Sequence, residues 1–450
     1  MGQTAVTDKR RELHLNAFLM EAGHHEASWR RPDSNPRADF DLDHWIGLAR
    51  LAESAKFDSL FLADGPATTG TGEFRPPGQL EPLTLLTALS QATQRIGLIA
   101  TVSTTYNDPY NLARRLASVD HVSRGRAGWN IVTSSDAFTG ANFRRGGFLD
   151  YADRYARAEE FVTVARRFWD SWDADAVLAD LEAGVYVDPD RIHRVEHSGS
   201  QFAVRGFATL PPGPQGHPVL LQAGDSADGR AFGARYADAL FTLHSSLQDG
   251  QRYYADVKGS AVSYGRDADQ LKVFPATTFV IGDTGADAED KARHIRHQQV
   301  SGATAIAMLE QVWGRDLSGY DPDGPLPDID PTDDTGITQG RVRHVDPAAV
   351  VRDYRERAEA ENLSIRELVI AVTNRQQFVG TAAQVATEID QYVQADACDG
   401  FILVPHLTPR GLDEFVDRVV PLLQERGAFR TEYSGETLRE HLGLRVGECQ

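Results

Sequence analysis

One segment near the middle of the chain has the composition of an anion-binding turn. It reads LLQAGDSADGRAFGARYA, in which an apolar run passes through Ala-Gly-Asp-Ser into a helical pattern. Backbone N–H groups at a helix N-terminus, the positive end of the helix dipole and a serine hydroxyl together suit a phosphate group. Gly224 and Ser226 are the candidate ligands, and Asp225 would have to point away. An ordinary capped helix explains the same residues equally well.

Other polar side chains stand where apolar runs end. His24 and His25 follow the first run, and Asp64 ends the second. The third run ends within Thr101 to Tyr106. The fourth run carries Asn130 and ends at Thr133 and Ser134. In a barrel of parallel strands the active site lies at the carboxyl ends of the strands, so these side chains are the first candidates for a site.

Several common kinds of site are disfavoured. The chain has no G-x-S-x-G, Walker, G-x-G-x-x-G or H-E-x-x-H motif, which counts against hydrolases and nucleotide-driven motors. Neither His24-His25 nor the pair His294 and His297 has an obvious carboxylate partner for a metal site, and the aspartates of 316–336 lack the final glutamate of a calcium loop. We therefore predict no metal site, and a loop or lid at 316–336. Cys398 and Cys449 form no Cys-x-x-Cys pair, which favours a reducing compartment.

The elements that must position these residues are short apolar runs separated by amphipathic stretches. The runs predict strands at 14–21, 59–64, 95–104, 125–133, 218–224, 239–245, 271–282 and 399–405. Their nearly continuous hydrophobicity suits parallel strands buried on both faces, and every gap is long enough for a crossover helix. Eight such strands predict an α/β fold, a (β/α)8 TIM barrel.

Two long interruptions break this alternation, at 174–217 after strand four and at 283–375 after strand seven. The first follows a clear helical pattern at 151–172 and contains HSGSQFAVRG, which predicts a hairpin. The second predicts helices on both sides of the acidic, proline-rich stretch 316–336. We expect one barrel domain over 13–430 and a C-terminal tail at 431–450.

The composition of the chain limits the kinds of molecule that it is expected to bind. The 450 residues are 41% hydrophobic and 25% charged, as in a globular protein. A formal net charge of −19 disfavours nucleic acid as a partner and fits a small substrate better. The N-terminus is charged where a secretory signal needs an apolar core, and no run is long enough to span a membrane. The expected location is the cytoplasm.

Six sequence motifs, taken in their order along the chain, carry a resemblance to a known family. LNAFLMEAGHHEASWRRP, FDSLFLAD, TVSTTYNDPYNLARRLASVDHVSRGRAGWNIVTS, YADRYARAEEF, HSGSQFAVRG and QAGDSADGRAFG occur in succession. Over about residues 13–430 the chain resembles the FMN-dependent nitrilotriacetate, dibenzothiophene-sulfone and long-chain-alkane monooxygenases of the bacterial-luciferase-like group. The resemblance implies a barrel with insertions, and reduced FMN delivered by a separate NAD(P)H:flavin reductase. It also implies O2 as co-substrate, a flavin C4a-(hydro)peroxide as oxidant, a small organic substrate, and a homodimer or homotetramer.

The resemblance also assigns roles to residues. The family's flavin ligands fall on Asp64, Thr101, Tyr151, Tyr155 and Ser226, with Asp64 and Thr101 near the ring and Tyr155 and Ser226 at the phosphate. Asn130, Thr133 and Ser134, in WNIVTS, would line the other edge of the ring, and the candidate catalytic residues are His25, Trp29 and Asn130.

Three departures from the family pattern bear on these roles. Tyr151 stands where several relatives have histidine. Glu21-Ala22-Gly23 lacks a cysteine of the alkane-oxidising relatives, and Ser135-Asp136 follows WNIVTS where histidine or tyrosine is common, so an alkane substrate is disfavoured.

Two other functions remain open at this point. A deazaflavin-dependent oxidoreductase could use the same barrel to transfer hydride without oxygen, but HSGSQFAVRG and WNIVTS favour the FMN branch. A flavin-binding barrel without catalysis could keep the phosphate site and lose the substrate pocket. The presence of His25, Trp29 and the polar residues of strand four argues against that second alternative.

Overall fold

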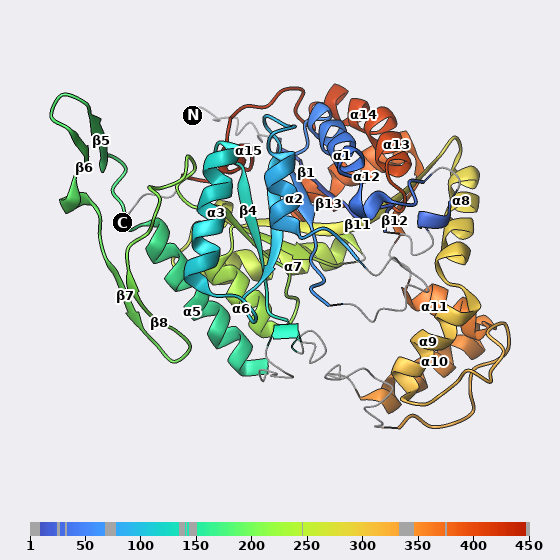
Figure 1. Cartoon of the computed structure of the whole chain (residues 1–450). Helices are drawn as coiled ribbons and strands as arrows, with labels where there is room; N and C mark the ends of the chain where they lie inside the picture. The colour runs from blue at the N-terminus through green and yellow to red at the C-terminus, as the bar shows by residue number, and fades with distance from the viewer. Residues whose placement is uncertain are drawn as a thin grey trace, which may run out of the picture.

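A closed barrel of parallel strands forms the centre of the molecule (Figure 1). The computed structural model describes residues 10–24, 28–31, 34–67, 78–134, 140, 142–143, 151–244, 246–332, 346–373 and 376–446. Within these ranges the barrel strands are β1 (His14–Phe18), β2 (Ser59–Leu62), β3 (Gly97–Ser103), β4 (Ala127–Val132), β9 (Val219–Gln222), β10 (Ala239–Thr242), β11 (Lys272–Gly282) and β13 (Gly400–Leu403). Neighbours pair in parallel, and β13 with β1 and β10 with β11 complete the ring. The predicted eight-stranded barrel is confirmed.

Helices cover the outside of the barrel (Figure 1). They are α1 (Leu42–Ser54), α2 (Pro82–Leu89), α3 (Pro109–Ser123), α5 (Tyr151–Trp169), α6 (Ala227–Tyr236), α7 (Leu247–Ser263), α12 (Ala382–Gln394), α13 (Arg410–Arg418) and α14 (Val420–Glu425). Carboxylate caps define several starts: Asp108 accepts hydrogen bonds from the first turn of α3, and Pro109 occupies the first helical position. The apolar faces of α1 and α3 are buried against the barrel.

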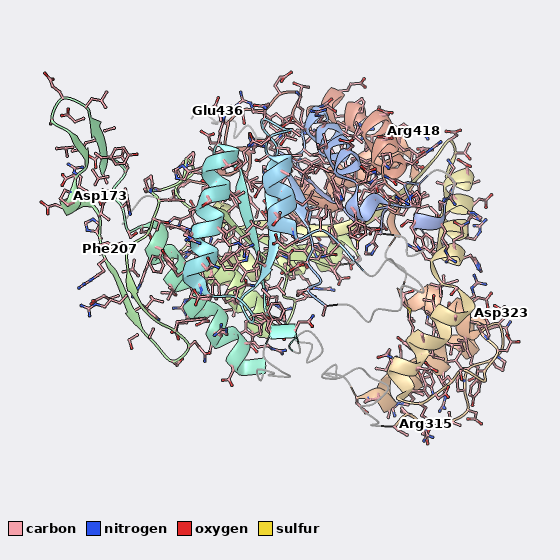
Figure 2. The ribbon with its side chains drawn as sticks, in the orientation of Figure 1. Asp173, Phe207, Arg315, Asp323, Arg418 and Glu436 are labelled. Atoms are coloured by element: carbon pink, nitrogen blue, oxygen red, sulfur yellow. The ribbon has the colours of Figure 1, made fainter. Side chains whose placement is uncertain are left out.

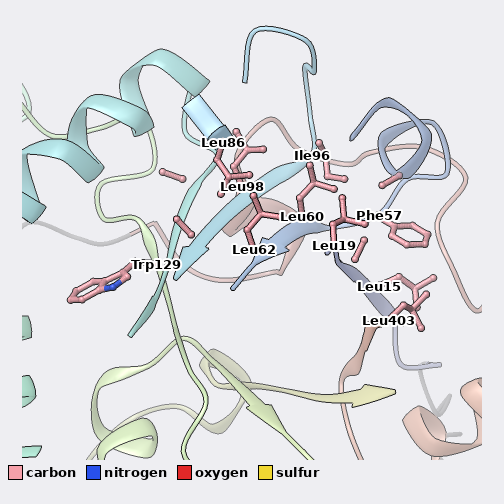
Figure 3. Close-up of a cluster of buried hydrophobic side chains, with 14 of the residues drawn as sticks. Leu15, Leu19, Phe57, Leu60, Leu62, Leu86, Ile96, Leu98, Trp129 and Leu403 are labelled. Atoms are coloured by element: carbon pink, nitrogen blue, oxygen red, sulfur yellow. The ribbon is translucent and has the colours of Figure 1, made fainter. Parts of the chain in front are cut away.

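Side chains of the strands alternate between two cores. Leu60 and Leu62 point outward into the layer beneath the helices, where Leu86 of α2 meets them (Figure 3). Phe61, between them, points into the barrel with Ile99. Because both faces of each strand are covered, the strands are apolar almost throughout, and this is why their positions are readable from the sequence.

The last described residues close the amino-terminal end of the barrel. The short helix α15 (Leu438–His441) places Leu438 in the interior cluster with Leu442 and Leu444. A Cβ atom added to Gly97, at the start of β3, would lie 2.4 Å from Leu438 Cδ1. The stretch 431–450, expected to be a tail outside the barrel domain, thus supplies part of the barrel core. Its polar sequence around three spaced leucines gave no sign of this.

The residues 438–444 form a plug at the amino-terminal end of the barrel, and shortening one of its leucines should lower the stability of the protein. Leu438→Ala removes a fully buried side chain from a packed interior and is expected to lower the free energy of unfolding by about 2–5 kcal/mol. Leu181→Ala, at a side chain that is 97% exposed, is the matched control and should change it by less than about 0.5 kcal/mol. Urea unfolding followed by fluorescence measures both. Equal midpoints for the two variants would show that the plug contributes nothing.

The first interruption forms two antiparallel hairpins outside the barrel. They are β5 (Val177–Asp180) with β6 (Val185–Val187), and β7 (Val195–Ser198) with β8 (Ala203–Gly206). The hairpin predicted at HSGSQFAVRG is confirmed. Glu160 of α5 holds its turn, since its carboxylate accepts hydrogen bonds from the N–H groups of Gln201 and Phe202 and contacts His197 Nε2 at 2.9 Å.

The second interruption contains a small helical unit with its own core. It comprises α9 (Gly302–Trp313), α10 (Pro347–Glu361) and α11 (Ile365–Thr373). The preceding helix α8 (Gly285–Gln299) packs on β11 and on strand β12 (Gln376–Thr381), which follows the unit. Trp313 is fully buried among the apolar residues of the unit and donates through Nε1 to the carbonyl of Ile329, 2.9 Å away. The described part of the proline-rich stretch therefore packs against α9. The structure also adds β12, which pairs with the outer half of β11 and was not predicted.

No helix in the described ranges has both the length and the apolar character that a membrane span needs.

Candidate functional site

A polar pair lies inside the barrel near its carboxyl end. Asn130 of β4 and Thr101 of β3 are both buried, and Asn130 Nδ2 donates to Thr101 Oγ1 at 2.9 Å. Asn130 Oδ1 is also buried, and it has no hydrogen-bond partner among the described residues. Because buried acceptors are nearly always satisfied, this oxygen is suited to a donor on a bound molecule. The structure thus brings together two residues that the sequence placed at a flavin ring.

The loop after β4 is held by a network of its own. Ser134 Oγ lies 2.7 Å from Ser103 Oγ, and the Ser134 N–H donates to Thr105 Oγ1 at 3.1 Å. Arg154 of α5 donates to the Ser134 carbonyl at 3.2 Å. Ser134 therefore fixes the loop, while its neighbour Thr133 is half-buried beside it. Tyr151 begins α5, but its side chain lies outside the described residues, as does all of His25.

A hydroxyl-rich cradle lies at the N-terminus of α6. Ser226 caps this helix, accepting a hydrogen bond from the Gly229 N–H at 3.1 Å. Tyr155 reaches over from α5 and its hydroxyl lies 3.5 Å from Ser226 Oγ. An added Cβ on Gly224 would be 3.1 Å from the Tyr155 oxygen, and one on Gly229 would be 2.9 Å from it. The two glycines thus let the β9–α6 turn, the first turn of α6 and the Tyr155 hydroxyl approach closely, and glycines, hydroxyls and a helix N-terminus are the composition of a phosphate site.

Asp225, the acidic residue within this turn, is turned toward a cation. Arg230 donates to the Asp225 carbonyl at 3.2 Å, and its guanidinium lies 3.9 Å from the Asp225 carboxylate. Arg230 also contacts Asp256 at 3.4 Å. Arg230 therefore offsets the negative charge that Asp225 brings to the cradle.

Asp64 lies two residues beyond the end of β2, which stops at Leu62. The side chain is half-buried and accepts a hydrogen bond from Gln79 Nε2 at 3.3 Å. Burial raises the pKa of Asp64 above its ordinary value, and the nearby Glu81 carboxylate raises it further. Gln79 is thus a hydrogen-bond donor to this carboxylate. The strand end predicted at residue 64 is two residues too far along.

Two histidines at the barrel mouth were missed in the sequence. His244 follows β10, and burial lowers the pKa of its imidazole to about 4, so the ring is neutral near pH 7. His406 follows β13 and lines a cavity of about 140 Å³ with His24, Thr278, Met308 and Thr373. Both follow apolar runs, so the rule applied to the first four strands would also have selected them. Arg157, which donates to the Thr104 carbonyl at 3.0 Å, was also missed.

The cavity beside His406 lies between the barrel mouth and the helical unit. Its walls come from the loops after β1 and β13, from β11, and from α8, α9 and α11. No carboxylate is among its described lining residues. The loop after β1 is fixed here because the His24 N–H donates to the Pro405 carbonyl at 3.0 Å. Trp29, in the same loop, is half-buried, and its buried Nε1 has no hydrogen-bond partner among the described residues.

Aromatic rings close the barrel beneath the mouth. Phe18 and Phe61 meet with ring centroids 5.0 Å apart, and Phe61 stacks on Phe241 at 5.8 Å. These rings come from β1, β2 and β10 and join the interior apolar cluster. They form an apolar floor on which a planar ring could rest. No group of three or more His, Cys, Asp or Glu side chains within the described ranges could hold a metal ion.

Comparison with known proteins agrees with this geometry. Residues 20–399 match the family model described as luciferase-like monooxygenase. The chain is 41% identical over 442 residues to N-acetyl-S-(2-succino)cysteine monooxygenase of Bacillus subtilis (strain 168), covering 98% of each protein. It is 40% identical to nitrilotriacetate monooxygenase component A of Aminobacter aminovorans, covering 96% of this chain and 97% of the relative.

A solved structure is also similar to this chain over nearly its whole length. Riboflavin lyase, crystallised with modified FMN and its substrate riboflavin, superposes with a TM-score of 0.80 at 30% identity, and 97% of each chain is covered. The match in sequence spans the barrel and both insertions, and the match in structure extends over the same length. The chain belongs to the luciferase-like monooxygenase family.

Proposed function

We propose that this monooxygenase binds reduced FMN at the barrel mouth, with the phosphate in the cradle of Gly224, Ser226, Gly229 and Tyr155. The observation that carries the proposal is the meeting of two hydroxyls at the N-terminus of α6, beside two glycines where a Cβ atom would collide with its neighbours. FMN differs from riboflavin by one phosphate group, which a helix N-terminus and two hydroxyls would bind.

The flavin ring would lie above the aromatic floor, near Thr101 and Asn130. The unpartnered Asn130 Oδ1 is an acceptor in a buried setting, and a reduced flavin ring carries N–H donors. When bound, reduced FMN supplies the electrons with which dioxygen is activated for transfer of one oxygen atom to the substrate. The chain's part is to orient the ring, to exclude water with Phe18, Phe61 and Phe241, and to hold the substrate near it.

The substrate would occupy the cavity of about 140 Å³ between the mouth and the helical unit. Two close relatives are named for N-acetyl-S-(2-succino)cysteine and nitrilotriacetate, which are both small carboxylic acids with a sulfur or nitrogen centre. A lining without carboxylates, with His24 and His406, is compatible with such an anion. We propose a small carboxylated thioether or amine as the substrate, with His25 and Trp29 on the substrate side.

A separate NAD(P)H:flavin reductase would supply the reduced flavin. The sequence holds no G-x-G-x-x-G motif for a nicotinamide dinucleotide, and one close relative is named as component A of its enzyme. The purified chain with FMN and NADH should therefore leave NADH unoxidised, as absorbance at the nicotinamide band would show. Adding any flavin reductase should start NADH and oxygen consumption. NADH-driven turnover without a second protein would contradict the two-component assignment.

Asp64 provides a test of ring binding. Asp64→Ala is expected to weaken reduced-FMN binding about tenfold, or to divert a large share of the oxygen consumed into free hydrogen peroxide, with little change in melting temperature. The reason is that its half-buried carboxylate lies at the mouth, and removing it loses about one charge-assisted hydrogen bond to the ligand. Glu425→Ala, an exposed acidic residue of α14, is the control. Unchanged coupling with a lowered melting temperature would remove Asp64 from the site and leave it as a turn residue.

A further inference from the structure

The chain contains few sulfur atoms, and two of them lie at the proposed substrate cavity. The sequence has three methionines, Met1, Met20 and Met308, and two cysteines. Within the described residues Cys398 is fully buried, and burial raises the pKa of its thiol well above the ordinary value, so the thiol stays protonated. Met308 lines the cavity of about 140 Å³ between the barrel mouth and the helical unit, and Met20 follows β1 at the mouth. Both described thioethers therefore adjoin the place where oxygen chemistry is proposed.

Met308 stands on the face of α9 that does not pack into the core of the helical unit. Ile306 and Leu309 belong to that core, whereas the side chain of Met308 is 36% exposed. The same cavity is lined by His24 and His406, from the loops after β1 and β13. The long, flexible side chain of methionine suits a wall that adapts to an incoming molecule. The Met308 side chain is thus one of the groups that a molecule in this cavity would meet.

Met20 differs from Met308 because its sulfur is engaged by a neighbour. Its Sδ lies 3.0 Å from His24 Nδ1, and the backbone N–H of His24 donates to the Pro405 carbonyl, which fixes the loop. A thioether has no hydrogen to donate, so in this contact Nδ1 is the donor and the sulfur is the acceptor. A hydrogen bond of this kind draws electron density from the sulfur and makes it a weaker nucleophile. Of the two sulfurs, that of Met308 is therefore the more reactive.

Oxygen activation without a substrate produces an oxidant for thioethers. Dioxygen that takes two electrons from reduced flavin and two protons, and gives no oxygen atom to a substrate, becomes hydrogen peroxide. The lone pair of a methionine sulfur attacks one oxygen of the peroxide, the O–O bond breaks, and the proton of the attacked oxygen passes to the departing one. Methionine sulfoxide and one water result, so the sulfur loses two electrons and the peroxide gains two. A substrate in the cavity would occupy the space beside Met308 and shield it from this reaction.

We infer that Met308 is a site of oxidative modification, which the chain converts to methionine sulfoxide when it activates oxygen with an empty substrate cavity. The observations that carry the inference are the place of Met308 in the cavity wall, its exposed fraction, and the barrel-mouth residues that line the same cavity. The inference rests on the proposed function, because the oxidant must form at the mouth. The sulfoxide adds a polar oxygen to the wall, so the modified chain should bind its substrate more weakly until a methionine sulfoxide reductase restores the thioether.

The test compares Met308 with a reference sulfur far from the cavity. Leu181→Met places this reference at a side chain that is 97% exposed, in the turn between β5 and β6. Figure 2 shows that hairpin beyond Asp173 and Phe207, on the opposite side of the molecule from the helical unit near Arg315. The variant receives NADH, a flavin reductase, FMN and oxygen without substrate, in the presence of catalase, which destroys hydrogen peroxide in solution. Peptide mass spectrometry then measures the sulfoxide at each position over time.

Met308 should be oxidised at least about tenfold faster than the reference sulfur, because peroxide formed at the mouth meets Met308 before it reaches the solution. In added hydrogen peroxide, without flavin or catalase, the reference sulfur should be oxidised first, because oxidation then follows exposure.

Two further results decide between the inference and the function on which it rests. Adding Ser226→Asp, which should weaken the binding of reduced FMN, should abolish the preference for Met308. If Met308 and the reference sulfur are oxidised at equal rates, or neither is oxidised, in a chain that binds reduced FMN in an anaerobic titration, the inference is wrong and the proposed function stands. If the chain does not bind reduced FMN in that titration, both are wrong.

Discussion

Ser226→Asp is expected to weaken the binding of reduced FMN about 30- to 700-fold. A carboxylate at this position would stand about 4 Å from the phosphate, where two unit charges repel by about 1 kcal/mol in water and about 4 kcal/mol in a partly shielded site. Because the phosphate carries up to two charges, we expect a cost of about 2–4 kcal/mol. Each 1.4 kcal/mol is tenfold in affinity. The measurement is an anaerobic titration of the protein with reduced FMN, followed by fluorescence or calorimetry. The expected loss of affinity is large because the substitution places a negative charge beside the phosphate, whereas loss of the hydroxyl alone would remove only one hydrogen bond.

The substitution has a folding control built into it. Aspartate caps helices as well as serine does, so α6 should keep its N-terminus and the melting temperature should stay close to that of the parent. Ser226→Ala, which removes one hydroxyl and adds no charge, should weaken binding by only about tenfold or less. If Ser226→Asp binds reduced FMN as tightly as Ser226→Ala, the phosphate is not in this cradle.

Arg430→Met should lower the free energy of unfolding by about 3–5 kcal/mol. Arg430 forms a buried ion pair with Asp58, whose side chain is fully buried and also contacts His14 Nδ1 at 2.9 Å. Removing one partner leaves a buried carboxylate without its main countercharge, which is far more costly than the loss of an exposed pair. Arg426→Met, at an exposed arginine of the same region, should change stability by less than about 0.5 kcal/mol. Denaturant unfolding at pH 7 compares the two, and equal losses would contradict the role of the buried pair.

The same ion pair makes the stability of the fold depend on pH under acidic conditions. Burial by itself would raise the pKa of Asp58, but Arg430 and His14 hold that pKa at about 2, below the value of about 3.9 in an unfolded chain. A carboxyl group with a lowered folded pKa stabilises the fold above its unfolded pKa, and the stability is lost as the pH falls from about 4 to about 2. Arg430→Met removes the cause of the lowered pKa, so the variant should lose less stability than the parent over that pH range.

The barrel was predictable because parallel strands buried on both faces leave a strong local signal. Runs such as 97–103 are apolar almost throughout, and their number and spacing fix the topology. Strand ends were less predictable: β2 stops at Leu62 because Asp64 belongs to the loop. β12 was missed because it pairs only with the extended outer half of β11. The plug formed by α15 was missed because three leucines in a polar stretch do not reveal a contact with residues that lie far away in the sequence.

Site residues were predictable where they lie close together in the sequence. They were less predictable where the fold brings distant segments together. Gly224 and Ser226 stand in one short turn, so the sequence alone suggested an anion site there. Tyr155 came from the family resemblance, and its hydroxyl lies beside Ser226 because α5 crosses the start of α6. Arg157 and His406 act through contacts between distant segments. Asn130 shows its unpaired oxygen only once the barrel has closed.

We propose above that the cradle at the start of α6 recognises the phosphate of reduced FMN. The most direct measurement compares the binding of reduced FMN and reduced riboflavin to the parent and to Ser226→Asp, without oxygen. The parent should bind reduced FMN at least about tenfold more tightly than reduced riboflavin, because only FMN carries the phosphate. In Ser226→Asp that preference should vanish or reverse, while riboflavin affinity stays near the parent's. Equal affinity of the parent for the two flavins, or a preference for FMN that survives the substitution, would contradict the claim.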